Sequence, residues 1–239
     1  MPYAARLLTA TVALLVATGA AFAQAPPLPP VRPPASVPAP AAPPAAGPAA
    51  TPAAARQGAA LDQSEIVQRA NAFLNSLTTL TGDFAQTGGD GRQYRGRLYV
   101  QKPGKLRFEY NPPAVIEVVS DGTSVIVRDR KLATQDLYAI GQTPLKFLLK
   151  EQLDLSRDTT VLRASADGDN ASVTLEDRNT LGGVSRITLT FDSKSFALKN
   201  WRIRDPQGHD TFVALSNIDT SSRPDPGKFR IDYQRDLGR

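Results

Sequence analysis

The 239-residue sequence contains no cysteine. Disulfides and thiolate metal ligands are therefore excluded, and so is a lipid anchor built on a cysteine thiol. A secreted domain of ordinary size does not need disulfides, because it can bury a core large enough for stability. Any contact of this protein with a membrane is therefore expected to be made by a soluble molecule without a lipid of its own.

Histidine is almost as scarce as cysteine. The single one, His209, lies between Gly208 and Asp210 in a predicted turn, where we interpret it as a solvated loop residue. One histidine and no cysteine leave no zinc site rich in imidazole or thiolate, and no Ser-His-Asp triad is expected. Asp167 and Asp169 lack the glycine and glutamate of a calcium loop, so we assign them to a hairpin turn.

Glycine-rich phosphate loops are also missing from the sequence. We therefore expect a protein that is not an enzyme and that has no catalytic residues, metal or cofactor. Residue counts leave a hydrolase that uses only carboxylates open, but no pair of carboxylates indicates one.

The excess of positive charge does not indicate a nucleic-acid partner. The chain has 28 basic and 23 acidic residues, a net charge of +5. Three of the basic residues (Arg6, Arg32 and Arg56) and none of the acidic ones precede Leu61, which leaves 25 against 23 in the rest. Charges of both signs alternate there, as on an ordinary solvated surface. We expect no nucleic-acid binding.

The composition divides the chain into three parts. Residues 1–23 have the pattern of a signal peptide: a positive start, a short apolar run from Leu7 to Val16, and a small-residue cleavage site before Gln24. This predicts export to the periplasm. Residues 24–60 are almost entirely proline and alanine and predict a disordered, extended linker, because they offer no side chains to bury. Residues 61–239 have the size of one domain.

The folded part begins with a helical pattern and continues with strands. Apolar residues at helical spacing predict a helix over 61–80, with a capping box formed by Asp62 and Glu65. From Gly82 onward the period changes to two, and turn signals such as Asp121-Gly122 separate roughly ten short strands. Thr143-Pro144 interrupts them and predicts a second, short helix with proline at its first position.

An antiparallel sheet of that width must curl, and the alternation gives it a charged outer face and an apolar inner face. Two helical stretches are available to cover the inner face. Two arrangements fit this pattern: a concave interior with room for a ligand, or a fully packed α+β core.

Several stretches together resemble the outer-membrane lipoprotein carrier family, LolA. The run from Lys102 to Tyr110 is similar to the family's signature strand. The other stretches agree with the family in order and spacing: Phe84-Ala85-Gln86, Ser120-Asp121-Gly122 with Asp129, Thr143-Pro144-Leu145 with Leu148-Leu149, Leu198 with Trp201, Asp205 with Gly208, and Phe229.

The resemblance covers about residues 61–233 and implies a mostly β fold, an unclosed antiparallel β-barrel with an α-helical lid over an apolar cavity. It also implies a periplasmic chaperone, acting as a monomer, that binds the acyl chains of lipoproteins. Such a shuttle would receive lipoproteins from an inner-membrane ABC-type lipoprotein-releasing complex and deliver them to an outer-membrane lipoprotein receptor. A carrier or sensor of the same fold for another lipid, such as a glycolipid, hopanoid or lipopolysaccharide, is the alternative.

Candidate residues for the cavity and its lid follow from the inward-facing positions. They are Ile66, Phe73, Leu77, Phe84, Leu98, Val100, Leu106 and Phe108. The resemblance also implies a role for Lys102, which stands where the family usually has an arginine that bonds the lid's backbone and holds the cavity shut. A lysine keeps the charge but lacks the planar fork of a guanidinium group.

Overall fold

The computed structural model describes residues 61–233, so the predicted signal peptide (1–23) and the whole predicted linker (24–60) lie outside the described residues. Helix α1 covers Gln63–Ser76. Its N-cap is Asp62, whose carboxylate accepts a hydrogen bond from the Glu65 backbone N–H at 2.7 Å. This contact confirms the predicted role of Asp62 at the helix start.

The predicted helix of 61–80 is too long at its C-terminal end. Leu77 is already extended, and strand β1 begins at Thr79. The apolar spacing misled the prediction because Leu77 and Leu80 are both buried, although Leu80 is a strand residue. Thr78 and Thr79 favour extended backbone, since β-branched side chains are restricted in a helix.

Eleven strands form one antiparallel sheet. They are β1 (Thr79–Thr87), β2 (Gln93–Gln101), β3 (Lys105–Tyr110), β4 (Ile116–Asp121), β5 (Ser124–Asp129), β6 (Thr134–Ala139), β7 (Thr160–Asp167), β8 (Asn170–Thr180), β9 (Gly183–Asp192), β10 (Leu198–Arg204) and β11 (Asp210–Asp219). The spatial order is β6-β5-β4-β3-β2-β1-β11-β10-β9-β8-β7. Because β6 and β7 stand at opposite ends of this order, the sheet curls without closing, as predicted.

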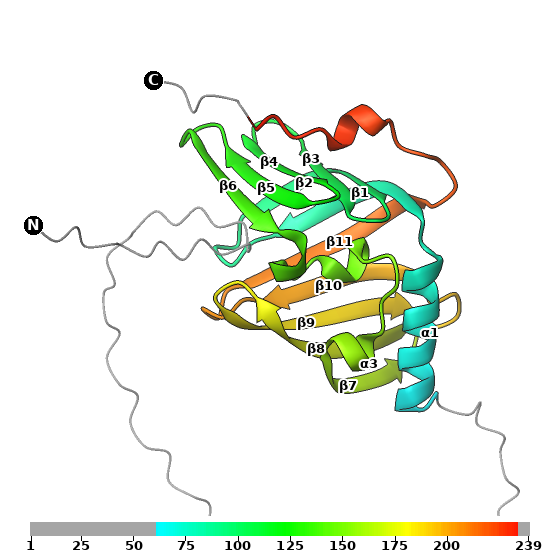
Figure 1. Ribbon diagram of the computed structural model, residues 1–239. Coiled ribbons are helices and arrows are strands. Elements are labelled where there is room, and N and C mark those ends of the chain that lie inside the picture. Colours follow the sequence, from blue (N-terminus) through cyan, green and yellow to red (C-terminus); the bar gives the residue numbers. More distant parts are fainter. Residues whose placement is uncertain (1–60, 234–239) are drawn as a thin grey trace, which may run out of the picture. The chain divides into compact units, whose positions relative to one another are not determined.

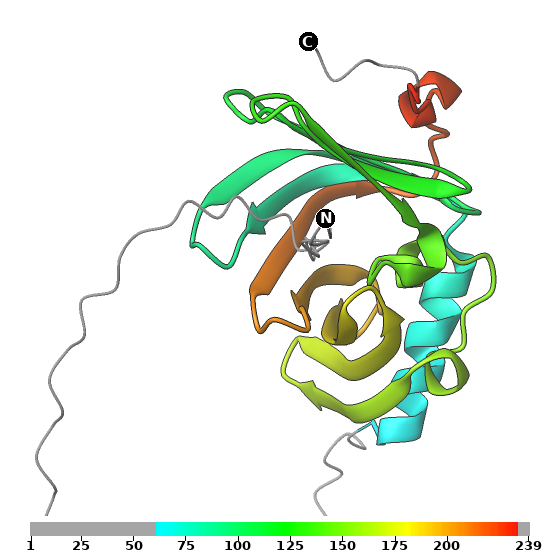
Figure 2. The same ribbon diagram turned by 60° about the vertical axis from the view of Figure 1, so that its left-hand side comes forward.

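The curled sheet encloses the core on its concave side. Figure 1 shows α1 lying beside β7 and β8, and Figure 2 looks into the curl. Inward-facing side chains alternate with exposed ones, as in β3, where Leu106 and Phe108 are buried between partly exposed neighbours. This alternation follows from the two-residue repeat of a strand and places one apolar face inside the curl.

The connection from β6 to β7 also covers the concave side (Figure 2). It contains η1 (Ile140–Gln142), α2 (Lys146–Leu149) and α3 (Leu155–Asp158). Pro144 was predicted at the first position of a helix, but it lies in the turn that precedes α2. The Lys146 backbone N–H bonds the Thr143 carbonyl there, so the turn rather than the helix contains the proline. Leu145, Leu148 and Leu149 of this segment are buried.

The C-terminal part of the domain crosses the outer face. After β11 the chain continues to η2 (Pro226–Phe229), drawn in red in Figure 1. Lys228 pairs with Glu109 on β3 at 2.8 Å, and the Arg107 guanidinium donates to the Lys228 carbonyl at 3.3 Å. Phe229 is buried. These contacts leave the concave side to α1 and the β6–β7 connection.

Candidate functional site

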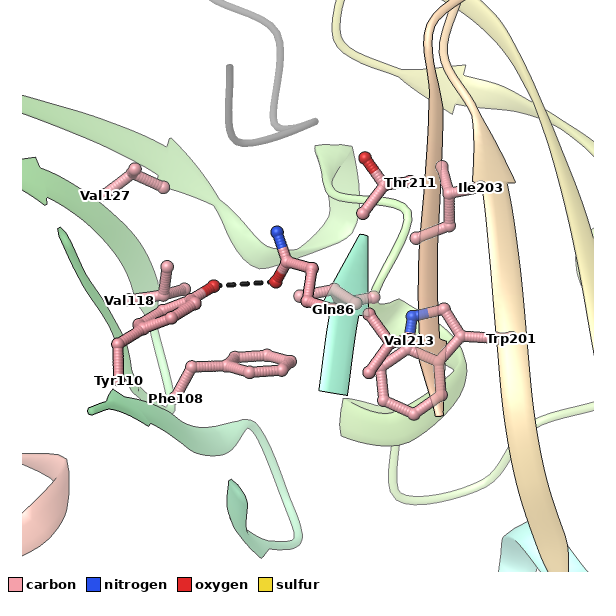
Figure 3. Close-up of a pocket in the computed structure, with 10 residues that line it drawn as sticks. Gln86, Phe108, Tyr110, Val118, Val127, Trp201, Ile203, Thr211 and Val213 are labelled. Atoms are coloured by element: carbon pink, nitrogen blue, oxygen red, sulfur yellow. Dashed lines mark hydrogen bonds between the residues drawn. The ribbon is translucent and has the colours of Figure 1, made fainter. Parts of the chain in front are cut away.

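A small pocket lies on the concave side of the sheet (Figure 3). Its volume is about 40 Å³, enough for a few water molecules but far too small for an acyl chain. Side chains from β1, β3, β4, β5, β10, β11 and the segment before α2 line it: Gln86, Phe108, Tyr110, Val118, Val127, Leu145, Trp201, Ile203, Thr211 and Val213. The interior around this small pocket is therefore mostly packed.

Aromatic rings form one wall of this region. The ring of Phe84 lies edge-on to Phe108 and to Tyr110, each at 5.0 Å between centroids. Gly96 stands between Phe84 and Tyr110 in the strand register. A Cβ at Gly96 would lie 2.9 Å from the Phe84 ring and 2.0 Å from the Glu109 carbonyl oxygen. The missing side chain of Gly96 therefore lets the two rings meet across β2.

Polar groups enter this apolar wall at one end of the pocket. The Tyr110 hydroxyl donates to Oε1 of Gln86 at 2.8 Å. Burial raises the pKa of Tyr110 well above its usual range, so this hydroxyl stays protonated. Thr211 also lines the pocket, and its Oγ1 is buried without a hydrogen-bond partner among residues 61–233. The pocket thus combines apolar walls with a few polar atoms.

Helix α1 and the β6–β7 connection (residues 140–158) together form the cover over the concave side. Hydrogen bonds from side chains of α1 to the backbone of the connection join the two parts. Asn75 of α1 donates to the Leu153 carbonyl at 2.9 Å and accepts from the Leu153 N–H at 2.8 Å. Asn71, one turn earlier, accepts from the Leu155 N–H at 3.0 Å. Each such bond contributes about 1 kcal/mol, so they tie α1 to the β6–β7 connection without fixing it permanently.

The turn between β2 and β3 holds both parts of the cover. The Lys102 ammonium donates to the Leu74 carbonyl in the last turn of α1 at 2.6 Å. The Gly104 backbone N–H donates to the Leu149 carbonyl at the end of α2 at 2.8 Å. A cation suits the C-terminal end of a helix, where carbonyl groups lack partners within the helix. Lys102 therefore has the contact with the helix backbone that the sequence resemblance implied.

Desolvation lowers the pKa of Lys102 to about 8. Its carbonyl contact favours the ammonium form, and burial opposes it. At neutral pH the side chain still carries its charge. Arginine in the same place would keep its charge at every accessible pH, so the lysine makes this contact sensitive to alkaline conditions.

The predicted cavity residues occupy several places in the structure. Phe108 lines the pocket, and Phe84 packs against it. Phe73 is half-buried, with its ring 6.2 Å from that of Phe191. The others are fully covered parts of the same core: Ile66, Leu77, Leu98, Val100 and Leu106. Their contact with a ligand stays a prediction.

Two kinds of residue were not predicted from the sequence: those that join the two parts of the cover, and the polar residues of the pocket. Asn75 lies off the apolar stripe of its helix and gave no signal in the sequence, but it bonds Leu153, which is 78 residues away in sequence. Gln86 belongs to a stretch that resembles the family pattern, and its inward position in an alternating strand could have marked it as a buried polar group. No sequence signal indicated Thr211.

The LolA family model, described as outer membrane lipoprotein carrier protein LolA, matches residues 75–232. The chain belongs to this family. The match includes the whole sheet but only the last two residues of α1, and it agrees with the unclosed antiparallel barrel described above.

Relatives of this LolA-family chain carry the same description. A protein from Chromobacterium violaceum, named outer-membrane lipoprotein carrier protein, is 29% identical over 178 residues, covering 72% of this chain and 85% of that protein. One of the same name from Methylococcus capsulatus is 27% identical and covers 68% of this chain and 81% of its own. The crystal structure of a LolA superfamily protein from Nitrosomonas europaea aligns with a TM-score of 0.41 at 13% identity, covering 72% of this chain and 99% of that one.

Proposed function

We propose that this LolA-family protein is a periplasmic carrier that binds the acyl chains of lipoproteins and brings them to the outer membrane. One observation carries the proposal: an apolar concave sheet is covered by two short segments that a small number of hydrogen bonds hold in place. A site that must take up and release a greasy cargo needs such a cover. The carrier description of the family and of its relatives supports a binding protein rather than an enzyme.

The energetics require a cover that opens and a fit that is only partial. Burial of one CH₂ contributes about 0.8 kcal/mol, so a fully buried chain of about sixteen carbons would contribute roughly 12 kcal/mol. Complete burial of several chains would make release too slow for a shuttle. The 40 Å³ pocket is far smaller than an acyl chain, so the apolar residues that cover one another would have to separate to admit cargo.

The binding surface in the open state would combine the pocket with the neighbouring concave residues. Phe84, Leu98, Val100, Leu106 and Phe108 would contact the acyl chain from the sheet. Ile66, Phe73 and Leu77 would contact it from α1 and the residue after it. Lys102 would favour the closed state through its bond to the Leu74 carbonyl.

The proposed route begins at an inner-membrane ABC-type lipoprotein-releasing complex and ends at an outer-membrane lipoprotein receptor, with the carrier acting as a monomer. The energy for release from the membrane would come from the ATPase. The carrier itself needs only intermediate affinity, so that the receptor can remove the cargo. Within residues 61–233, no helix is long and apolar enough to cross a membrane.

Displacement of an apolar fluorescent dye by a synthetic diacylated lipopeptide tests the binding step. Val127→Glu places a charge at a half-buried position of the pocket and should reduce lipopeptide binding at least tenfold, because an acyl chain would have to cover a carboxylate. Val184→Glu is the matched control, since Val184 is 46% exposed on β9. Phe108→Glu should have a larger effect, with circular dichroism confirming that the sheet persists.

Two results would contradict the proposal. If the wild-type protein does not bind the lipopeptide, it is not a lipoprotein carrier. If it retains a glycolipid, hopanoid or lipopolysaccharide on purification from the periplasm instead, it carries or senses another lipid.

A further inference from the structure

The pocket contains a group of polar side chains that the binding of a hydrocarbon chain would not need. Gln86 and Thr211 are only 4% and 7% exposed, although both line an otherwise apolar pocket. Gln86 Oε1 is paired with the Tyr110 hydroxyl, whereas Thr211 Oγ1 is buried without a partner among residues 61–233. A buried polar atom without a partner destabilises a protein, and a valine would fill the place of Thr211 at a lower cost. The presence of these polar side chains calls for a ligand with polar atoms of its own.

The Gln86 amide is held in a defined orientation. One of its two polar atoms bonds the Tyr110 hydroxyl, which stands at the end of β3, at 2.8 Å. In Figure 3 the other amide atom, the nitrogen, points away from Tyr110 into the space bounded by Val127 and Thr211. Thr211 Oγ1 is the second polar atom at this space, and it is buried without a partner in the part of the chain that the structure describes.

Both groups can donate a hydrogen bond to a ligand. An amide nitrogen carries two hydrogens, and a threonine hydroxyl carries one. Two neutral donors in an apolar pocket suit a neutral acceptor, and the carbonyl oxygen of an acyl ester is such an acceptor, joined directly to a hydrocarbon chain. A charged headgroup is not favoured, because none of the pocket's lining residues carries a charge.

The strand geometry gives the chain a path from this point. The polar pair lies at the Tyr110 end of β3, and Lys102 lies just before its other end, about 20 Å away at roughly 3.3 Å per residue. Between them, on the same concave side, are Phe108, Leu98, Leu106 and Val100, which are buried under the cover. An acyl chain whose carbonyl binds at the polar pair would run over these residues once the cover opens.

From this arrangement we infer that Gln86 and Thr211 form a subsite for the ester carbonyl of an acyl chain, so that the protein selects acyl esters over hydrocarbon chains that lack the carbonyl. The inference rests on the proposed carrier function and adds ligand specificity to it. Tyr110 is a positioning residue in this subsite, because it orients the amide without being required to touch the ligand.

The test compares two lipopeptides that differ only in the linkage of their chains. One carries two palmitoyl esters on its glyceryl group, and the other carries two hexadecyl ethers of matched length. Dye displacement from the full-length protein gives a dissociation constant for each. The wild-type protein should bind the ester about 3- to 10-fold more tightly, the range that one or two net hydrogen bonds supply.

Variants of similar shape should remove this preference. Gln86→Met and Thr211→Val should each bring the ester-to-ether ratio toward one while leaving ether binding unchanged or slightly stronger, because an uncompensated polar atom is gone. Gln93→Met and Thr190→Val, on exposed or half-exposed positions of β2 and β9, are the matched controls and should keep the wild-type ratio.

The possible failures are distinguishable. Equal wild-type affinity for ester and ether overturns the subsite while the carrier function stands, and this result needs no variant to fold. A preference that survives both substitutions overturns the assignment to Gln86 and Thr211. If the wild-type protein binds neither lipopeptide, the carrier function fails and the subsite fails with it.

Discussion

The two halves of the concave side differ at the pocket rather than along their whole length, since Leu98 and Leu106 of β2–β5 are also completely buried. Over β7–β10 the interior is covered by α1, α2 and α3, and residues such as Leu74, Leu155 and Trp201 are completely buried. Over β2–β5 the residues at the pocket are less enclosed, since Tyr110 and Val127 stay partly exposed. The pocket lies where the second half meets the first, with Trp201 on one side and Val127 on the other.

This difference separates stability from binding within one sheet. A fully packed half can hold the fold together, because removal of buried atoms there leaves a cavity. We expect the pocket half to lose its cover without unfolding of the domain, since the packed half keeps its own buried core. The concave surface of β2–β5 is therefore the part we expect to receive the ligand, and the following predictions compare the two halves.

The largest expected effect comes from truncation in the packed half. Leu155→Ala should lower the free energy of unfolding by about 3–5 kcal/mol, because Leu155 is completely buried between α1 and the sheet. Leu145→Ala removes the same atoms beside the pocket and should cost about 2 kcal/mol while increasing uptake of an apolar dye. Urea denaturation and dye fluorescence measure both. Equal costs and equal dye uptake would show that the two halves do not differ.

A smaller effect is expected from the contact that holds α1 closed. Lys102→Met removes the ammonium from the Leu74 carbonyl, which should cost about 1 kcal/mol and speed hydrogen exchange in the last turn of α1. Dye binding by the empty protein should rise. Lys102→Arg should restore slow exchange. The control is Lys105→Met, which changes the same charge three residues later. If exchange in α1 is the same in all variants, Lys102 does not hold the helix.

The same lysine predicts a pH dependence with a definite sign. The pKa of Lys102 is about 8 in the folded protein, against 10.5 for an ordinary lysine. Between these values the unfolded chain binds more protons than the folded one, so this group makes stability increase as the pH rises from about 8 to 10.5. Because the side chain is only partly buried, we expect a gain in unfolding free energy of about 1 kcal/mol, which is well under the value that the full pKa shift would give.

Lys102→Arg provides the comparison for that pH profile, since a guanidinium does not titrate in this range. Subtracting its unfolding free energies from those of the wild type isolates the contribution of Lys102 from those of other titrating groups. A difference that does not change between pH 7.5 and 10 would contradict the lowered pKa.

The smallest effect is expected outside the described domain. Deletion of residues 25–55, which are mostly proline and alanine, should leave the thermal midpoint unchanged within about one degree. Their side chains offer almost nothing to bury. A clear drop in the midpoint, seen by calorimetry of the full-length and shortened proteins, would show that this segment packs against the domain.

Local patterns in the sequence were sufficient for most of the fold. Alternation predicted the strands and their inward faces, and Asp62 marked the helix start, because both depend on residues a few positions apart. The end of α1 was placed wrongly, because Leu80 is apolar at helical spacing but is buried by the sheet. The position of Pro144 was also wrong, since the segment around it is shaped by packing under the curl.

The site was less accessible to sequence reasoning than the fold. Phe108 was found because an inward aromatic residue in an alternating strand is a candidate for any concave surface. The bonds of Asn71 and Asn75 to the β6–β7 connection join parts of the chain about 80 residues apart, and no local pattern encodes them. Thr211 becomes part of the pocket only because β11 pairs with β1 across the whole length of the domain.

The most direct test of the central claim is photocrosslinking with a lipopeptide whose acyl chains carry a diazirine group, followed by mass spectrometry of the adducts. Opening of the cover over β2–β5 predicts adducts on the concave residues of these strands, such as Leu98, Phe108 and Val118, and on the segment from Leu145 to Leu149. Exposed outer positions such as Arg95 should stay unmodified. Adducts confined to the outer face would contradict the account, and so would adducts only between α1 and β7.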